Sequence, residues 1–336
     1  MRIEENYSLL KHNTFGLDVK TRFFVEYENE GDLQKLLEDE YFLSQTFWHI
    51  GQGSNLLFLG DYAGVIVHSG ITGIEVVKED DNHIWLKVGA AEDWDNFVAY
   101  CVNKGWGGIE NLSFIPGEVG ASAFQNIGAY GVEAADCIVE VHAYSLETRE
   151  KKIFTKEKCN YSYRHSFFKE TENRGLYYIT HVVFQLDKAP QFKLDYGNLR
   201  TYLEGRELDL KTIREAVIAI RKTKLPDPKV MGSAGSFFMN PYVGMVYYEA
   251  LKKKHPAIPH YPVNDEVVKI PAAWLIEQCG LKGKKLGGAA ISEMQPLVIV
   301  NQSNATGREI ASLAETVCQE VKEKFNIELQ PEVNYI

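Results

Sequence analysis

Hydrophobic positions along the chain follow two periods, and their alternation predicts a protein of mixed strands and helices. Short apolar runs bounded by turn residues predict strands at residues 23–27, 47–50, 56–59, 64–68, 84–88, 138–144, 177–186 and 296–301. Apolar residues three or four apart predict a helix that begins at Asp32, one from Trp94 to Cys101, and others at residues 213–223, 272–278 and 308–325. This order predicts a fold of the α/β and α+β classes.

The length of 336 residues exceeds what one hydrophobic core usually supports, so several domains are expected. The first α/β unit closes with the strand at 64–68, which predicts a first region at residues 1–70. Two prolines within residues 223–229 interrupt a helix and indicate a junction. We therefore expect a second region at 71–225 and a third at 226–336.

Charge and composition exclude several classes of partner. A formal net charge of −10 argues against nucleic acid and anionic membranes, which need a basic surface. No apolar run is long enough to span a bilayer, and the first residues carry acids in place of a secretory signal. Five scattered cysteines and nine histidines without metal-ligand spacing predict free thiols and no metal. We expect a cytoplasmic monomer.

Two glycine-containing segments have the composition of ligand-binding loops. The glycine turn, Gly51-Gln52-Gly53-Ser54-Asn55, offers backbone N–H groups and polar side chains to an anion, although a tight turn is the favoured interpretation for the segment alone. It matches neither a Rossmann fingerprint nor a P-loop. The small-residue segment, residues 116–131, has four glycines, three alanines and one serine. This density predicts the close approach of a large ligand, such as a dinucleotide.

Residues 235–241 place a serine between a glycine and two aromatic residues. A serine hydroxyl both gives and takes a proton, so Ser236 in a dry aromatic pocket could protonate a carbanion or an enol. A buried turn in which Phe237 and Phe238 fill the core explains the same composition, and it is the favoured interpretation for the segment alone.

Two further charged residues are candidates. Arg164 lies beside Tyr161 and Tyr163, and its planar donor fork suits a carboxylate or an enolate. A surface arginine stacked on tyrosines is the alternative. Glu332 follows the last predicted helix, where a solvated surface carboxylate is the ordinary expectation.

In combination, these motifs resemble those of the UDP-N-acetylenolpyruvoylglucosamine reductases, flavoenzymes of bacterial peptidoglycan synthesis. The resemblance covers nearly the whole chain, through residues 13–16, 51–55, 115–117, 125–131, 163–164, 225–228, 235–238, 240–241 and 331–333. Residues 195–199 match the tyrosine-bearing loop, near 190–205, of the longer type I members.

The resemblance implies a two-part FAD-binding fold of the vanillyl-alcohol-oxidase type at residues 1–70 and 71–225. It implies a substrate-binding α/β domain at 226–336 whose C-terminal tail returns to the active site. FAD, held without a covalent bond, is the implied cofactor, and NADPH is the implied co-substrate. The implied FAD-binding residues are Gly51, Gln52, Gly53, Ser54, Asn55, Pro116, Gly117, Gly120, Ala121, Ser122, Asn126, Gly128 and Gly131.

The resemblance also implies the reaction, in which UDP-N-acetylglucosamine enolpyruvate becomes UDP-N-acetylmuramate. Flavin N5 gives a hydride to C3 of the enolpyruvyl group, and Ser236 gives a proton to C2. Arg164 stabilises the developing enolate. Glu332 is either protonated or holds a water or the arginine in place.

The implied substrate-binding residues are Tyr163, Tyr196, Lys224, Asn240, Tyr261, Lys269 and Gln295. Lys224 and Lys269 offer point charges to phosphate, and Tyr196 could close over the nucleotide as a lid. Glu118 lies within the small-residue segment, where an acid does not suit a pyrophosphate. We expect its side chain to point away from the phosphates.

Two alternative functions remain open at this point. A flavin-dependent oxidase of the same fold often tethers its flavin to a histidine, and neither the glycine turn nor the small-residue segment contains one. A non-catalytic nucleotide-sugar-binding protein explains the tyrosines and lysines. It does not explain the combination of Ser236, Arg164 and Glu332.

Overall fold

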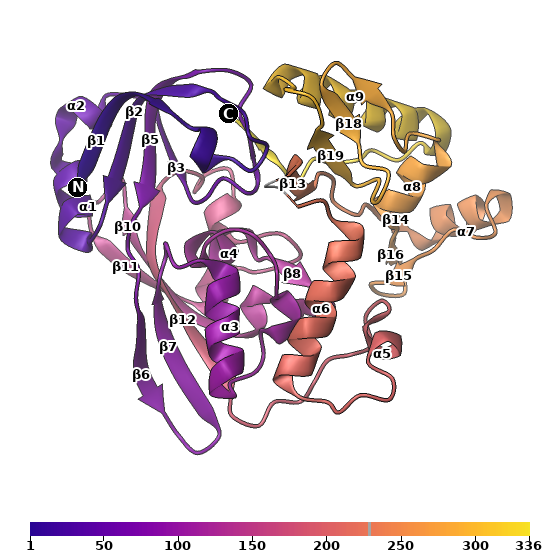
Figure 1. Cartoon of the computed structure of the whole chain (residues 1–336), viewed down its shortest axis with the longest axis horizontal. Coiled ribbons are helices and arrows are strands. Elements are labelled where there is room, and N and C mark those ends of the chain that lie inside the picture. Colours follow the sequence, from indigo (N-terminus) through magenta and orange to yellow (C-terminus); the bar gives the residue numbers. More distant parts are fainter. Residues whose placement is uncertain (228–229) are drawn as a thin grey trace. The chain divides into compact units, whose positions relative to one another are not determined.

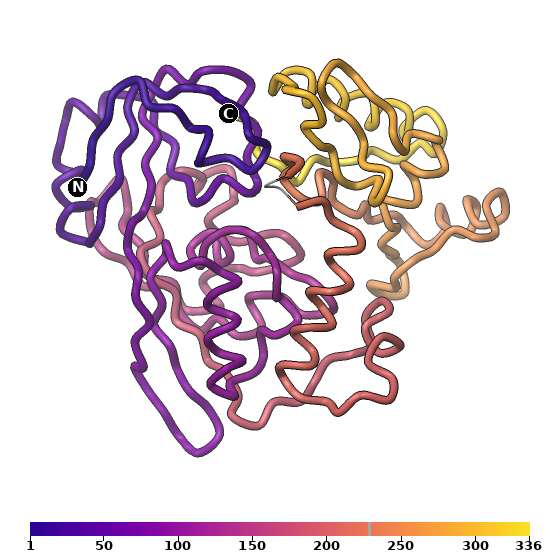
Figure 2. Tube along the Cα trace, viewed as in Figure 1, coloured from indigo at the N-terminus to yellow at the C-terminus, as the bar shows by residue number. Residues whose placement is uncertain are grey.

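The computed structural model describes residues 1–227 and 230–336, which form two compact units (Figure 1). Pro228 and Lys229, part of the predicted junction, lie outside the described residues. The first unit comprises Met1–Tyr7, Thr21–Gln52 and Ala63–Arg221. The second comprises Ser8–Lys20, Gly53–Tyr62 and Lys222–Ile336, which includes the orange-to-yellow part of the trace in Figure 2.

The first unit contains two sheets. The first sheet has the order β1-β2-β5-β3, formed by β1 (Arg2–Ser8), β2 (Lys20–Tyr27), β5 (Tyr62–Ser69) and β3 (Phe47–Ile50). The second is antiparallel with the order β11-β10-β12-β7-β6, formed by β11 (Lys151–Thr155), β10 (Ile138–Ser145), β12 (Tyr177–Asp187), β7 (His83–Gly89) and β6 (Ile74–Glu79). A two-stranded ribbon adds β8 (Gly128–Ala129) and β9 (Val132–Glu133).

Three helices, α1 (Glu30–Glu38), α3 (Trp94–Lys104) and α4 (Val119–Gln125), bury apolar side chains against these sheets. On α3, Trp94, Phe97 and Val98 are buried in one core with the inward side chains of β7, β10 and β12. Burying each large apolar side chain contributes roughly 1.5–3 kcal/mol. The other helices of this unit are α2 (Glu40–Leu43), α5 (Leu199–Tyr202) and α6 (Leu210–Lys224).

The second unit contains an antiparallel sheet of order β13-β19-β18-β17 and a smaller one of order β14-β16-β15. Its strands are β13 (Gly232–Ser236), β14 (Tyr242–Gly244), β15 (Tyr261–Pro262), β16 (Val267–Lys269), β17 (Lys285–Leu286), β18 (Ala289–Ile291) and β19 (Val298–Asn301), with β4 (Leu56–Leu57) and β20 (Asn334–Tyr335) forming a parallel pair. Its helices are α7 (Met245–Lys254), α8 (Ala272–Gln278) and α9 (Gly307–Phe325). Short 3-10 turns occur at Leu10–His12, Glu110–Leu112, Ala134–Asp136, Lys156–Cys159 and Phe167–Lys169.

The predicted mixture of strands and helices is confirmed, but the structure also contains elements that the sequence did not predict, among them β1, β6, β11 and α7. The first helix begins at Glu30, not at Asp32, because the side chain of Asn29 accepts a hydrogen bond from the Asp32 N–H at 2.9 Å and caps the helix. The small-residue segment contains the unpredicted helix α4. All five cysteines are free thiols, as expected.

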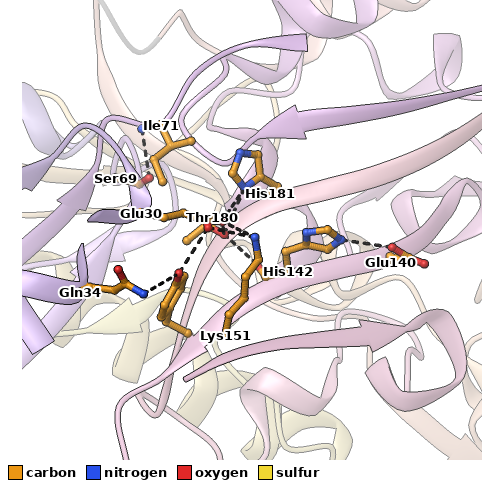
Figure 3. Close-up of polar contacts among 10 residues, drawn as sticks. Glu30, Gln34, Ser69, Ile71, Glu140, His142, Lys151, Thr180 and His181 are labelled. Atoms are coloured by element: carbon orange, nitrogen blue, oxygen red, sulfur yellow. Dashed lines mark hydrogen bonds and ion pairs between the residues drawn. The ribbon is translucent and has the colours of Figure 1, made fainter. Parts of the chain in front are cut away.

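A polar cluster joins α1 to the second sheet within the first unit (Figure 3). Lys151 on β11 donates to Glu30 at 2.7 Å, and the hydroxyl of Thr180 on β12 donates to the same carboxylate at 3.2 Å. His181 lies 3.4 Å from this carboxylate through its Nδ1. Burial opposes ionisation of Glu30, but Lys151 outweighs it and lowers the pKa of Glu30.

This cluster predicts that stability falls in acid. Burial lowers the pKa of His181 to about 4, against 6.5 for the unfolded chain. Between these values the unfolded chain binds a proton that the folded chain does not, so stability rises with pH across this window. We expect about 1–2 kcal/mol, after allowance for solvent screening. Urea unfolding of His181→Asn should show a flatter pH dependence between pH 4 and 6.5.

His165→Asn is the control, because the ring of His165 is 39% exposed and that of His181 is 17% exposed. An unchanged acid slope in His181→Asn would mean that another group causes the loss of stability.

Candidate active site

The C-terminal tail, residues 330–336, binds two segments of the second unit that are distant in sequence. On one side, the Glu332 N–H donates to the carbonyl of Phe237 at 2.8 Å, and the Met239 N–H donates to the carbonyl of Gln330 at 2.9 Å. On the other side, the Asn55 side chain donates to the carbonyl of Glu332 at 3.0 Å, and β20 pairs with β4. The tail therefore connects the glycine turn to the strand that ends at Ser236.

Ser236 lies at an irregularity in the sheet. Ser233 pairs with Val300 and Ser236 with Val298, so β13 contains an extra residue between these pairs. Gly235 has φ +68°, a left-handed conformation that favours glycine. The side chain of Ser236 is exposed, whereas those of Phe237 and Phe238 are buried, as the sequence predicts. The bulge thus turns the serine out of the core that the two aromatic rings occupy.

Residues of the predicted substrate-binding set gather on the smaller sheet of this unit. Lys269 on β16 is paired with Tyr242 on one side and Tyr261 on the other, and directly paired residues point to the same face. The Lys269 ammonium lies 5.9 Å from the centre of the Tyr261 ring. Both tyrosines are largely exposed, at 50% and 40%. The sheet therefore presents a cation between two phenol rings, and Tyr242 is a residue that the sequence did not single out.

Asn240 and Gln295 also belong to the second unit. The Asn240 side chain accepts a hydrogen bond from the Ala272 N–H at 2.9 Å, which begins α8. The carbonyl of Gln295 accepts from the Val298 N–H at 2.9 Å, and Val298 is the register partner of Ser236. Lys224 is the last residue of α6 and is exposed.

In the first unit, the backbone of Gly128 positions the side chain of Arg164. Its guanidinium donates to the Gly128 carbonyl at 2.6 Å, and a Cβ at Gly128 would lie 2.8 Å from the same guanidinium. Arg164 has φ +56°, a conformation that costs energy for a residue with a side chain. The ammonium of Lys169 donates to its carbonyl at 2.7 Å and stabilises this backbone. The guanidinium also stacks on the ring of Tyr163 at 5.1 Å.

A second arginine near Arg164 escaped the sequence analysis. Arg221 on α6 donates to the carbonyl of Phe114 at 3.1 Å. Burial lowers the pKa of Arg221, and the nearby charge of Arg164 lowers it further. Tyr130 and Asp95 act in the opposite direction and raise it. This charge comes from an amphipathic helix, where a lone arginine gives no sequence signal.

Several glycines of the small-residue segment make room for the protein's own atoms. A Cβ at Gly120 would lie 2.8 Å from the Cβ of Ala90, and a Cβ at Gly131 would lie 3.3 Å from the Cβ of Tyr196. The loop that carries Tyr196 therefore packs directly on Gly131. The density of small residues is explained in part by internal packing, which the sequence alone could not distinguish from ligand contact.

Two polar members of the predicted FAD-binding set have internal partners. The Asn126 side chain is fully buried, donates to Glu133 and to the carbonyl of Ser162, both at 2.8 Å, and accepts from the Ala135 N–H at 3.0 Å. The Ser122 hydroxyl donates to the Val119 carbonyl at 2.7 Å. Their contact with FAD stays a prediction.

The glycine turn fits a polar cofactor in one observable respect. The turn spans the passage of the chain from the first unit, which ends here at Gln52, to the second, which resumes at Gly53. The Thr14 N–H donates to the Gly53 carbonyl at 3.3 Å, and the Thr14 hydroxyl is buried without a partner among the described residues. A buried hydroxyl without a partner is rare, and a polar ligand group would satisfy it.

The catalytic candidates occupy different units. Arg164 belongs to the first unit, and Ser236 and Glu332 belong to the second, where the tail places them on adjacent extended segments. Among residues 1–227 and 230–336, no group of three His, Cys, Asp or Glu side chains could hold a metal ion. Within the same ranges, no helix is long and apolar enough to cross a membrane.

Comparison with protein families gives two matches. Residues 227–336 match the family described as UDP-N-acetylenolpyruvoylglucosamine reductase, C-terminal domain. Residues 21–147 match the family described as FAD binding domain.

Full-length relatives carry the same name. The chain is 50% identical over 337 residues to the UDP-N-acetylenolpyruvoylglucosamine reductase of Bacteroides fragilis, covering 99% of this chain and 100% of the relative. It is 46% identical over 338 residues to that of Porphyromonas gingivalis, covering 100% of both.

Among solved structures, the UDP-N-acetylenolpyruvylglucosamine reductase of Thermus caldophilus has a TM-score of 0.70 at 22% identity, covering 100% of this chain and 99% of that one. Together with the FAD-binding match, this similarity confirms the predicted FAD-binding fold of the vanillyl-alcohol-oxidase type with a C-terminal α/β domain. The predicted boundaries at residues 70 and 225 and the individual site residues stay predictions.

The packing around Gly53 in the glycine turn predicts that one added methyl group destabilises the protein strongly. Gly53 has φ +71°, and a Cβ there would overlap the carbonyl oxygen of His12. We expect Gly53→Ala to destabilise the protein by about 2–4 kcal/mol. Gly60→Ala is the matched control, because nothing lies within 4 Å of its Cβ position. Thermal unfolding should separate the two variants, and equal melting temperatures would contradict the packing described.

Proposed function

The chain belongs to the UDP-N-acetylenolpyruvoylglucosamine reductase family, and from that premise we propose that it reduces UDP-N-acetylglucosamine enolpyruvate to UDP-N-acetylmuramate, with NADPH as the reductant. The protein is an FAD-dependent oxidoreductase of peptidoglycan synthesis. FAD, when bound, supplies the hydride that reduces the enolpyruvyl double bond. The glycine turn and the small-residue segment would hold it, without a covalent bond.

The observation that carries the proposal is the pairing of the tail with the strand of Ser236. Reduction of an enolpyruvyl group needs a proton at the carbon next to the carboxylate. Ser236 is turned out of the core, and the neighbouring Phe237 is hydrogen-bonded to Glu332. A hydroxyl and a carboxyl group are thereby held on adjacent backbone segments of one unit.

Ser236 is the proposed proton donor to C2. A serine hydroxyl is a weak acid, so it transfers its proton only to a strong base such as an enolate, and only if its own oxygen is then reprotonated. Glu332 is the proposed partner for this step, either as a protonated carboxyl group or through a water that it holds. A carboxylate facing the enolate directly would oppose the reaction, because like charges repel.

Arg164 is the proposed donor to the substrate carboxylate and enolate. Its contacts with Gly128 and Tyr163 restrict the guanidinium before substrate binds, and Lys169 stabilises the Arg164 backbone. Restriction in advance is what allows a donor to stabilise charge that develops in the transition state. The rest of the substrate is proposed to contact four further residues of the predicted set: Tyr196, Lys224, Asn240 and Gln295.

The row formed by Tyr242, Lys269 and Tyr261 suits the nucleotide half of the substrate. A lysine offers a point charge to a diphosphate, and an exposed phenol ring offers a face to a nucleobase. Because the three residues lie on paired strands of a small sheet, their spacing is set by strand register. This rigidity supports the proposed roles of Lys269 and Tyr261.

The visible spectrum of the purified protein tests the proposed function. We expect flavin absorbance that NADPH bleaches under anaerobic conditions, and that UDP-N-acetylglucosamine enolpyruvate restores. Release of the flavin by acid denaturation would support non-covalent binding. A protein whose bleached flavin is reoxidised by oxygen but not by this substrate would be an oxidase, and the proposal would fail.

Ser236→Ala separates the two halves of the reaction. Because Ser236 is assigned only to substrate reduction, we expect reduction of the flavin by NADPH to stay within about twofold of the native rate, and reoxidation by the substrate to slow by about 10²–10⁴-fold. Stopped-flow absorbance measures both steps. Ser303→Ala, an exposed serine of the same unit, is the control and should preserve both rates. Native reoxidation in Ser236→Ala would refute the assignment.

A further inference from the structure

A histidine in the first unit lies between two carboxylates. His68 is on β5, its Nδ1 is 2.8 Å from the carboxylate of Glu26 on β2, and its Nε2 is 2.9 Å from the carboxylate of Glu118. Glu118 is 5% exposed and belongs to the small-residue segment. These three residues, the Glu-His-Glu triad, connect the first sheet to the predicted FAD-binding loop.

The geometry of the triad requires an additional proton. A neutral imidazole has one N–H and can donate to only one of the two carboxylates. Its other nitrogen would then face carboxylate lone pairs at hydrogen-bond distance, which is repulsive. Both distances are satisfied when His68 is an imidazolium that donates from both nitrogens, or when one carboxyl group carries the proton. The triad then has a net charge of −1, and it has −2 once this proton is lost.

The surroundings of the triad favour retention of the proton. Burial opposes the charge on His68, but Glu118 and Glu26 outweigh it and raise the pKa of His68. Burial also raises the pKa of Glu118, with His68 opposing and the Asp93 charge adding to the increase.

Other titratable or charged groups face the triad from neighbouring elements. Arg2 on β1 lies 3.6 Å from Glu26. The hydroxyl of Tyr27 on β2 and the Nε2 of His49 on β3 are hydrogen-bonded at 3.0 Å. Tyr27 interacts electrostatically with Glu118, and His49 with His68. Burial lowers the pKa of His49 to about 3 and raises that of Tyr27, so both stay neutral near pH 7. Arg2 and Asp93 carry charges of opposite sign.

The triad contacts both loops that are predicted to hold FAD. A Cβ at Gly51 would lie 2.8 Å from the Glu118 carboxylate and 3.6 Å from the Cβ of Ala121, so the three residues meet at one point. The backbones of Glu118 and Asp93 are bridged, and the Asp93 carboxylate accepts from the Gln52 side chain at 3.2 Å. The position of Glu118 therefore decides how Gly51 and Ala121 are spaced.

We propose that the Glu-His-Glu triad is a positioning device for the FAD pyrophosphate, and that its shared proton couples FAD affinity to pH. While the proton is present, the two loops are held at a fixed spacing with the least negative charge beside the phosphates. Loss of the proton adds one negative charge and removes a hydrogen bond, so FAD binds more weakly as pH rises. The inference rests on the proposed placement of FAD against Gly51 and Ala121.

Release of FAD from the holoprotein at different pH values tests the inference. Dilution series at constant ionic strength between pH 6 and pH 9, followed by the fluorescence of free FAD, yield the dissociation constant. FAD keeps both phosphate charges across this range. We expect the dissociation constant of the native protein to rise about tenfold, as estimated for one partly screened charge near the phosphates. In His68→Asn, which removes the titrating imidazole, we expect a change of less than about twofold.

Glu75→Gln is the matched control, since it removes an exposed acid of the same unit outside the triad and should keep the native slope. Glu118→Gln keeps the size of the side chain but removes a carboxylate that raises the pKa of His68, so the rise in the dissociation constant should move to lower pH. Thermal unfolding of each variant shows whether it is folded. A pH-independent dissociation constant in the native protein, or a native slope in His68→Asn, would overturn the inference. Absence of FAD binding at every pH would instead contradict the proposed placement of the cofactor.

Discussion

Backbone pairing of the C-terminal tail is the constraint on which the candidate site of the second unit depends. Residues 330–336 satisfy the edge of β4 on one side and the segment after β13 on the other. Each hydrogen bond contributes only about 0.5–1.5 kcal/mol net, but leaving such groups unpaired inside a protein costs about 1–3 kcal/mol each. These pairings therefore fix the position of the tail backbone, and they place Glu332 between Phe237 and Asn55.

The long elements could be predicted from the sequence because their periods extend over enough residues. The eleven residues of β12 and the nineteen of α9 show their buried faces plainly. The strands β14, β15 and β16 have only two or three residues each, too few for a period to be visible. Their pairing, and with it the row containing Lys269, is set by tertiary contacts.

The sequence names candidate site residues but does not give their geometry. Local motifs single out Ser236 and Glu332, but those motifs do not predict that the tail pairs with the segment after Ser236. Glycine has several uses, and the sequence does not distinguish Gly128, which makes room for Arg164, from a glycine that contacts a ligand. The partner of Glu118 is fifty residues away in the chain, beyond the reach of any local pattern.

The division of the second unit into three stretches of chain has a consequence for its synthesis on the ribosome. Ser8–Lys20 and Gly53–Tyr62 emerge early, but most of their partners lie in Lys222–Ile336. At bacterial elongation rates the wait is on the order of 10–50 s, during which Phe15, Leu57 and Phe58 have no core to enter. Apolar side chains exposed during synthesis favour aggregation, so a chaperone that covers them in that interval would protect the nascent chain.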